Sequence, residues 1–161
     1  MDIIYAQSRM EFIKGEKPEG CVFCKDSIRD DNLVLYENDR VFVIMNKYPY
    51  NTGHLLVIPR RHVSDLDELT EEEDLALMNA TRLSARILKE KMCAQGLNIG
   101  MNLGKAAGAG IDDHMHIHIV PRWGGDSNFI TTIGCTRVIP EDIKVTYKAL
   151  LPHFEKPDQE G

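Results

Sequence analysis

The chain has 161 residues, of which 43% are hydrophobic and 27% are charged, and its formal net charge at pH 7 is −6. This composition is typical of one globular domain with a substantial core. No apolar run approaches the roughly 20 residues that a membrane span requires. The acidic balance argues against general nucleic-acid binding, which needs a basic surface, but it is compatible with a phosphate ligand held by backbone N–H groups.

Residues 1–20 are polar, contain glycine and proline, and are predicted to form an arm that leads into the domain. The first residues, "MDIIYAQSRMEF", lack the basic start and apolar stretch of a secretory signal, so we expect a cytoplasmic protein. Cys21 and Cys24 follow in "CVFC". In a cytosolic protein this spacing indicates a metal or redox site more than a disulfide.

Three β-rich segments come next: "LVLYEN", "RVFVIMN" and "HLLVIP". Asp39 separates the first two, which predicts an antiparallel pair joined by a tight turn. The clearest helix then begins at a capping box formed by Thr70 and Glu73, and we expect it to end at Gly96. Apolar residues at three- and four-residue steps predict its buried stripe, which consists of Leu75, Met78, Thr81, Ala85, Leu88 and Met92.

The last elements are a strand at "LNIGMN", a small-residue loop at "LGKAAGAGIDD", a strand containing "HMHIHIV" and a short C-terminal helix starting near Pro140. No βαβ alternation is visible. We therefore expect an α+β fold with a mostly antiparallel sheet of about five strands, one long helix and the short C-terminal helix. We divide the chain into an arm (1–20), the main domain (21–140), and the C-terminal helix and tail (141–161).

His114, His116 and His118 alternate with apolar residues, and such residues share one face of a β-strand. Met115, Ile117 and Ile119 are then expected to face the core. Neighbouring histidines on a strand are roughly 6.6 Å apart and the outer pair about 13 Å apart, so one metal ion hardly reaches all of them. The row could instead face phosphates. A solvated polar face and a purely metal-binding strand are the alternatives.

"HMHIHIV" resembles the signature of the histidine-triad (HIT) superfamily of nucleotide hydrolases and transferases. "YPYNTGHLLVIPRRHVSDLDEL" is similar to the family's Pro-Gly-His strand and the segment after it, and "MNLGKAAGAG" to its Gly-rich substrate loop. "VPRWGGDSNF" resembles the branch of fragile-histidine-triad proteins and bacterial dinucleoside polyphosphate phosphorylases. The resemblance covers residues 20–140. It implies a HIT-like fold and cleavage of dinucleoside polyphosphates, such as diadenosine tetraphosphate, or of nucleotide conjugates at the α-phosphate.

The resemblance also implies three catalytic residues. His116 is then the nucleophile that attacks the α-phosphorus and forms a nucleotidyl-histidine intermediate. His118 stabilises the charge that develops as the leaving group departs. His54 matches the family histidine that orients the ring of the nucleophile.

For nucleotide binding, the resemblance implies that Asn46 contacts the ribose hydroxyls and that Asn102 contacts a phosphate or the leaving group. Glycines of the loop would let backbone N–H groups approach phosphate oxygens; they are Gly104, Gly108 and Gly110. Ile44 and Leu56 suit the adenine pocket by position, although either could equally be core.

Zinc-containing bacterial HIT proteins are similar to this chain in a second set of residues, which implies a zinc site formed by Cys21, Cys24, His62 and His114. Four protein ligands leave no open position, so this zinc would be structural. Magnesium could accompany the polyphosphate substrate. Cys93 and Cys135 are expected to be plain thiols, and the family implies a homodimer formed through the long helix and a neighbouring strand.

The chain departs from the family pattern in the loop. Hydrolase-type members carry a polar residue where Gly110 stands, and Asp112 and Asp113 add negative charge near a phosphate site. Whether water or phosphate accepts the nucleotide is therefore open. Two other readings also remain: a nucleotide-binding module without turnover, and a hydrolase with a catalytic zinc on His114 and His116. The physiological substrate and the base preference do not follow from the sequence.

Overall fold

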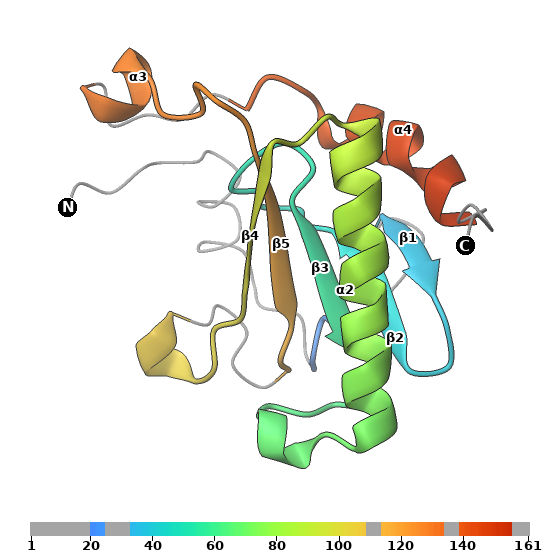
Figure 1. Cartoon of the computed structure of the whole chain (residues 1–161). Helices are drawn as coiled ribbons and strands as arrows, with labels where there is room; N and C mark the ends of the chain where they lie inside the picture. The colour runs from blue at the N-terminus through green and yellow to red at the C-terminus, as the bar shows by residue number, and fades with distance from the viewer. Residues whose placement is uncertain (1–19, 25–32, 109–113, 134–138, 156–161) are drawn as a thin grey trace.

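The computed structural model of the chain describes residues 20–24, 33–108, 114–133 and 139–155, except for the side chains of Ile130 and Thr132. It contains a five-stranded sheet in the order β1-β2-β3-β5-β4, and every neighbouring pair of strands is antiparallel. The strands are β1 (Val34–Glu37), β2 (Val41–Met45), β3 (Leu55–Pro59), β4 (Gly96–Gly100) and β5 (Ile117–Arg122). Figure 1 shows the long helix α2 (Glu71–Lys91) lying across the sheet and α4 (Ile143–Glu155) beside it. The predicted α+β class is confirmed.

Both faces of the central strands are covered. Val43 and Val57 belong to the main core, which includes side chains of α2 and α4. Their neighbours Ile44 and Leu56 belong to a second cluster with Phe23. Because successive residues of a strand point to opposite faces, the second cluster lies on the face turned away from the helices.

Helix α2 begins as predicted and ends earlier. The Thr70 hydroxyl accepts from the backbone N–H of Glu73, while the Glu73 carboxylate accepts from the backbone N–H of Thr70. The helix ends at Lys91, so the expectation that Gly96 ends it is wrong. Cys93 has a left-handed φ of 53°, which turns the chain out of the helix. Gly96 instead opens strand β4.

The buried face of α2 is not the predicted one. Leu75 and Met78 are 62% and 56% exposed. The buried residues are Glu73, Leu77, Ala80, Thr81, Ser84, Ile87 and Leu88. The hydroxyls of Thr81 and Ser84 donate to the carbonyls of the preceding turn, each at 2.8 Å. These internal bonds allow polar side chains to be buried, and a search for apolar spacing alone misses them.

The histidine segment is only partly a strand. Strand β5 begins at Ile117, so His114 and His116 lie in the stretch that leads into it. There the backbone N–H of Met115 donates to the carbonyl of Val63 at 2.8 Å. The predicted alternation is nevertheless present, because Ile117 and Ile119 lie in the main core.

The C-terminal helix α4 is part of the domain rather than an appendage to it. Leu150 and Phe154 are 1% and 2% exposed and lie in the main core. The hydroxyl of Tyr147 donates to the carbonyl of Val34 at 3.0 Å, which ties α4 to the edge strand β1. The helix starts at Ile143, slightly beyond the predicted Pro140. Within the described parts of the chain, no helix is both long and apolar enough to cross a membrane.

Candidate active site and metal centre

Two thiols and two imidazoles meet at one end of β3 and β5. Cys21 and Cys24 come from a turn before the sheet, His62 follows β3 and His114 precedes β5. Their ligand atoms all lie within 4.8 Å of one another. The sulfur of Cys21 lies 3.3 Å from Nδ1 of His114, and the sulfur of Cys24 lies 3.3 Å from Nδ1 of His62 and 3.9 Å from Nδ1 of His114.

The shape of this cluster fits a tetrahedral metal. Zn–S bonds of about 2.3 Å and Zn–N bonds of about 2.0 Å place sulfur and nitrogen roughly 3.5 Å apart in a tetrahedron, close to the distances found. Nε2 of His114 lies 2.8 Å from the carbonyl oxygen of Pro59. A carbonyl only accepts, so Nε2 carries the proton and the lone pair of Nδ1 faces the thiols. Burial also lowers the pKa of His114, which favours the neutral ring that a metal requires.

His116 is anchored through one ring nitrogen. Its Nδ1 lies 3.0 Å from the carbonyl oxygen of His114, so Nδ1 carries a proton and donates it. In the neutral ring the lone pair is then on Nε2. Burial lowers the pKa of His116 and favours this neutral form. Among the described residues, none forms a hydrogen bond with Nε2 of His116.

His54 and His118 form a hydrogen-bonded pair. The backbone N–H of Tyr50 donates to Nδ1 of His54 at 3.0 Å, and Nε2 of His54 lies 2.9 Å from Nδ1 of His118. A backbone N–H only donates, so Nδ1 of His54 is the acceptor. In neutral rings, Nε2–H of His54 then donates to His118, and His118 keeps its proton on Nε2. The direction of each bond follows from the one that precedes it.

The expectation that His54 orients the ring of His116 is therefore corrected. The residue that accepts from His116 is His114, through its main-chain carbonyl. His54 instead contacts His118. The ring of Tyr50 stacks on His118, with centroids 5.7 Å apart and planes inclined at 19°.

The lowered pKa values of His54, His116 and His118 keep these three rings electrically neutral near pH 7. Burial lowers the pKa of His54 to about 3, and the positive charges that His118 and His116 acquire when they are protonated act in the same direction. Burial lowers the pKa of His118 to about 4, with a further contribution from His116. A neutral cluster supplies both bare ring nitrogens and N–H donors, which acid–base and nucleophilic chemistry require.

The expected nucleotide-binding residues fall into separate groups. Ile44 and Leu56 share the face of His118, since Leu56 is the register partner of both Ile44 and His118. They are 6% and 4% exposed and belong to the cluster that includes Phe23. Asn46 follows β2, where its Oδ1 accepts from the backbone N–H of Tyr48 and its Nδ2 lies 3.3 Å from Nδ1 of His54.

The glycine loop is described only in part. Asn102 is half-buried after β4. Gly104 and Gly108 have φ values of 75° and 84° on either side of the short 3-10 helix η3 (Lys105–Ala107). Such φ values favour glycine. Gly110, Asp112 and Asp113 lie outside the described residues, as does Cys135, whereas Cys93 is a free, exposed thiol as expected.

Several residues around the site were not predicted from the sequence. The ring of Phe23, from "CVFC", packs edge-on against His116 with centroids 5.0 Å apart. Asn51 and Asp126 are hydrogen-bonded to each other at 2.9 Å although they are far apart in the sequence. The spacing of the two cysteines could have drawn attention to Phe23, but no local pattern relates Asn51 to Asp126.

One hollow in the described structure lies away from the histidines. It has a volume of about 470 Å³ and lies between the β1–β2 hairpin and α2, lined by residues that include Tyr36, Arg40 and Asn79. No histidine lines it. We therefore identify the functional site by the histidines and their hydrogen bonds.

Comparison with known proteins agrees with this geometry. A family described as HIT domain matches residues 29–125. The AP-4-A phosphorylase of Mycobacterium tuberculosis (strain ATCC 25618 / H37Rv) is 45% identical over 127 residues, which cover 79% of this chain and 65% of that relative. This chain therefore spans somewhat less than two thirds of that relative's length.

Solved structures give the same result. A Zn-bound histidine triad family protein from Mycobacterium smegmatis is 30% identical with a TM-score of 0.71, covering 88% of this chain and 97% of that one. A hypothetical histidine triad nucleotide-binding protein from Sulfolobus tokodaii is 30% identical with a TM-score of 0.68, covering 84% and 93%. The family match extends over more than half of the chain and includes most of the site. The chain belongs to the HIT domain family.

Proposed function

We propose that the chain cleaves dinucleoside polyphosphates, or related nucleotide conjugates, through a nucleotidyl-His116 intermediate. The observation that carries this proposal is the state of His116, whose Nδ1–H is held by the carbonyl of His114 at 3.0 Å. The lone pair on Nε2 attacks the α-phosphorus and forms a P–N bond, while the bond from phosphorus to the bridging oxygen breaks. Two steps with lower activation barriers replace one displacement with a high barrier.

His118 contributes the neighbouring donor. Its Nδ1 accepts from His54, so its remaining proton is on Nε2. This N–H donates to a phosphate oxygen or to the leaving group as negative charge develops there. A positioned donor of this kind is worth more inside a buried site than in water.

The second step needs an acceptor for the nucleotide. Water gives a nucleoside monophosphate, and inorganic phosphate gives a nucleoside diphosphate. The 45% identity to an AP-4-A phosphorylase supports phosphate as an acceptor. We therefore propose hydrolysis with a phosphorolytic branch.

Nucleotide contacts complete the proposed site. We assign the ribose to Asn46, the phosphates to Asn102 and the loop glycines Gly104, Gly108 and Gly110, and the base to Ile44 and Leu56. The position of Leu56 opposite His118 supports a base pocket next to the catalytic ring. The internal bonds of Asn46 leave part of its amide for a ribose hydroxyl.

We assign structural zinc to Cys21, Cys24, His62 and His114. The Cys₂His₂ donor set, the distances and a Zn-bound relative support this assignment. His116 is not part of the cluster, which disfavours a catalytic metal on His114 and His116. Bound zinc would tie the turn of residues 20–24 to the sheet. Magnesium enters the proposal only as part of the polyphosphate substrate.

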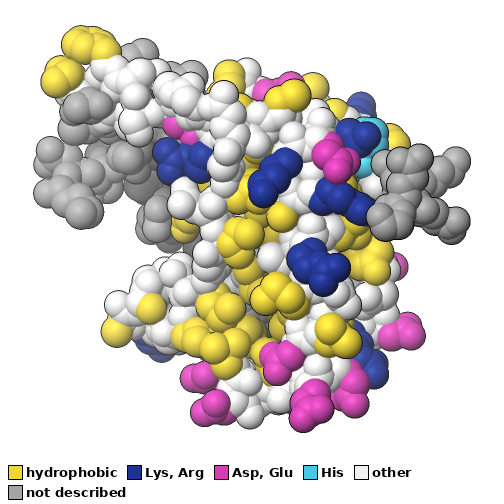
Figure 2. All heavy atoms as spheres, in the orientation of Figure 1, with side chains coloured by type: hydrophobic (Ala, Val, Ile, Leu, Met, Phe, Trp, Pro, Cys, Tyr) yellow, Lys and Arg dark blue, Asp and Glu magenta, His cyan; other side chains and the backbone are white. Residues whose placement is uncertain are grey.

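We also propose a homodimer in the cytoplasm. The exposed Leu75 and Met78 of α2 support an interface on this helix, and Figure 2 shows hydrophobic side chains gathered over β4 and the adjoining side of α2. A zinc site on Cys21 and Cys24 suits a reducing compartment, because zinc needs both cysteines as thiolates.

Intact-protein mass spectrometry with a panel of dinucleoside polyphosphates tests the catalytic proposal. We expect a nucleotidyl adduct on the wild-type chain and none on His116→Ala, whose turnover should fall on the order of 10⁴-fold or more. His118→Ala should lose on the order of 10²-fold to 10³-fold, because it removes one donor and leaves the nucleophile. Substantial turnover in His116→Ala would refute the covalent mechanism.

A titration with inorganic phosphate separates the acceptors. Product chromatography should show monophosphate replaced in part by diphosphate as phosphate rises. A constant monophosphate yield would leave a plain hydrolase. Nucleotide binding without any product from the panel would favour the module without turnover.

A further inference from the structure

One carboxylate joins two segments that border the catalytic histidines. Oδ2 of Asp126 accepts from Nδ2 of Asn51 at 2.9 Å, from Nε of Arg122 at 2.7 Å and from the backbone N–H of Trp123 at 3.2 Å. The amide of Asn51 also donates to the carbonyl of Pro121 at 2.9 Å. Asp126 therefore fastens the turn that contains Asn51 to the end of β5.

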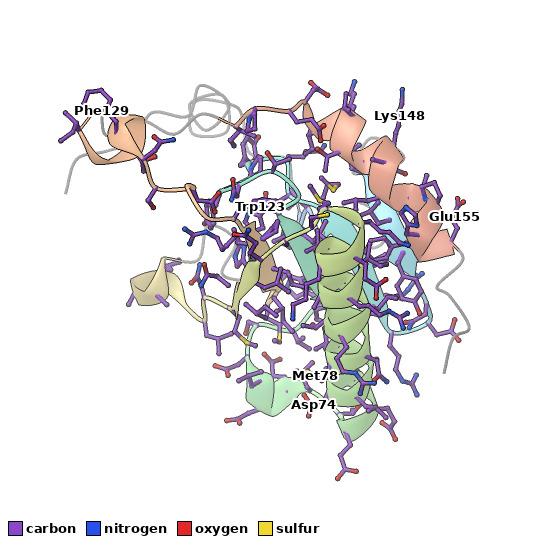
Figure 3. All side chains as sticks on the ribbon, turned by 45° about the horizontal axis from the view of Figure 1, so that its top comes forward. Asp74, Met78, Trp123, Phe129, Lys148 and Glu155 are labelled. Carbon is purple, nitrogen blue, oxygen red and sulfur yellow. The ribbon has the colours of Figure 1, made fainter. Side chains whose placement is uncertain are left out.

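This junction lies inside the protein. Asn51 is 6% exposed, and the side chain of Asp126 is 12% exposed. Burial raises the pKa of Asp126, but the bonds from Arg122, Trp123 and Asn51 outweigh it and lower the pKa overall, so the group is a carboxylate near pH 7. A charged acceptor forms stronger hydrogen bonds than a neutral one. Figure 3 shows Trp123 close to the end of α2, where its ring N–H donates to Met92 at 3.1 Å.

The turn fastened in this way also holds His54. Next to Asn51, the backbone N–H of Tyr50 donates to Nδ1 of His54, and the carbonyl of Asn51 accepts from the backbone N–H of His54 at 3.1 Å. Gly53 lets this turn pack closely against Met92. A Cβ there would lie 2.7 Å from the sulfur of Met92, and its φ is 76°. The turn thus has very little room on the side of α2.

The consequence concerns the proton positions in His54 and His118. The Tyr50 N–H keeps Nδ1 of His54 bare, which places the His54 proton on Nε2 and the His118 proton on its own Nε2. If the turn moves, Nδ1 of His54 loses the Tyr50 donor and keeps only the longer contact, 3.3 Å, from Nδ2 of Asn46. The other tautomer then becomes more accessible. His118 could then carry its proton on Nδ1 and present a bare Nε2 to the substrate.

We propose that Asp126 is a positioning residue that, through Asn51 and the Tyr50 N–H, fixes the tautomers of His54 and His118. The donor role of His118 rests on the proposed function. The tautomers themselves do not, because they are set in the free protein. NMR of the histidine rings therefore tests this proposal without substrate.

The experiment compares wild type with Asp126→Ala and the nearly isosteric Asp126→Asn in zinc-loaded protein. Long-range ¹H–¹⁵N spectra distinguish protonated from bare ring nitrogens. We expect Nδ1 of His54 and Nε2 of His118 to shift toward the average of two tautomers in Asp126→Ala, and less in Asp126→Asn. With substrate, kcat should fall on the order of tenfold to a hundredfold while KM changes little.

The matched control is Glu37→Gln. Glu37 also accepts from an arginine at 2.7 Å, but it lies at the exposed end of β1. It should change neither the ring spectra nor kcat. Unchanged His54 and His118 shifts in both Asp126 variants would overturn the proposal. A wild-type protein that shows the expected His54 and His118 tautomers but turns over no substrate would overturn the proposed function instead.

A swap tests the direct pair. Asn51→Asp brings a second carboxylate against Asp126 and should disturb the rings as strongly as Asp126→Ala. Adding Asp126→Asn restores an amide–carboxylate bond with the roles exchanged and should recover part of the ring signature and of kcat. A double variant no better than Asn51→Asp alone would contradict a direct contact.

Discussion

His118 is surrounded by rings. His54 donates to it, Tyr50 stacks on it, and the centroid of His116 lies 4.8 Å away. Tyr50, His54 and His116 are the titratable groups shown in contact with it. These rings exclude water from His118, and His116 repels a positive charge on it when His116 is itself protonated. The neutral form of His118 is therefore favoured in the folded protein.

This environment predicts the pH dependence. Burial, followed by the charge of His116, lowers the pKa of His118 to about 4 from 6.5. A lowered histidine pKa means that the unfolded chain binds more protons. Its contribution to stability is therefore complete above pH 6.5 and is lost as the pH falls toward 4. We expect the ring of His118 to stay neutral between pH 7 and about 5.

NMR titration of the ring protons, with zinc content measured at each pH, checks this prediction. The midpoint for His118 should lie near 4. A midpoint near 6.5 in zinc-loaded protein would contradict the buried, neutral ring.

At the residue scale, the sequence predicts side chains that share a short repeating pattern. His116 and His118 are found in this way, and both lie in the site. The predicted partner of His54 is wrong for a tertiary reason. The backbone N–H of Tyr50 and the side-chain amide of Asn46 both contact Nδ1 of His54, which leaves Nε2–H for His118. Asp126 and Asn51 meet through tertiary contacts, so no local spacing predicts them.

At the scale of elements, the turn of residues 20–24 depends on its cysteines. It contributes Phe23 to the small core on the catalytic face and has few other described attachments. A structural metal supplies folding energy directly to such a segment. In the proposed mechanism, zinc would affect bond breaking only indirectly, through the packing of Phe23 on His116.

We therefore expect Cys24→Ser to lower the zinc content from one ion per chain to nearly none. The melting temperature should fall by roughly 4–8 °C, which corresponds to about 2 kcal/mol in a domain of this size. In protein that remains folded, kcat should fall less than in His118→Ala. Elemental analysis and thermal melts measure both effects.

Cys93→Ser is the matched control, because Cys93 is an exposed free thiol after α2. It should retain zinc and stability. Fully loaded zinc in Cys24→Ser would contradict the ligand assignment.

The elements themselves are largely predictable from the sequence. All of the strands and both of the predicted helices are present, since turn residues and the Thr70–Glu73 capping box are local signals. The buried face of α2 could not be predicted from apolar spacing. Ser84 is polar but buried, with its hydroxyl bonded to a backbone carbonyl, and Met78 is apolar but exposed. Which face a helix buries depends on the sheet beneath it.

For the whole molecule, the exposed part of α2 matters most. Leu75 and Met78 lie on its outer side, and Figure 3 shows Met78 one turn beyond Asp74 near the start of the helix. β4 is an edge strand of the sheet, and its Ile99 is 49% exposed. Exposed apolar side chains in two neighbouring elements are typical of an interface.

We expect Met78→Glu to convert a dimer into monomers. In a symmetric interface the same residue is introduced from both copies, so the substitution buries two carboxylates at once. Sedimentation velocity across a concentration series measures the change. Val145→Glu on α4 is the control, because Val145 is similarly exposed, at 53%, on another helix. A wild-type monomer, or a Met78→Glu dimer as stable as the wild-type dimer, would exclude this interface.

His114 makes two separate contacts. Its ring faces the thiols, and its main-chain oxygen accepts from Nδ1 of His116. Every amino acid has that oxygen. A substitution of His114 could therefore remove the proposed metal ligand without removing the carbonyl that accepts from the proposed nucleophile, His116. Related proteins could therefore lose the metal ligand at this position and keep the hydrogen bond to His116, because the first depends on the side chain and the second on the backbone.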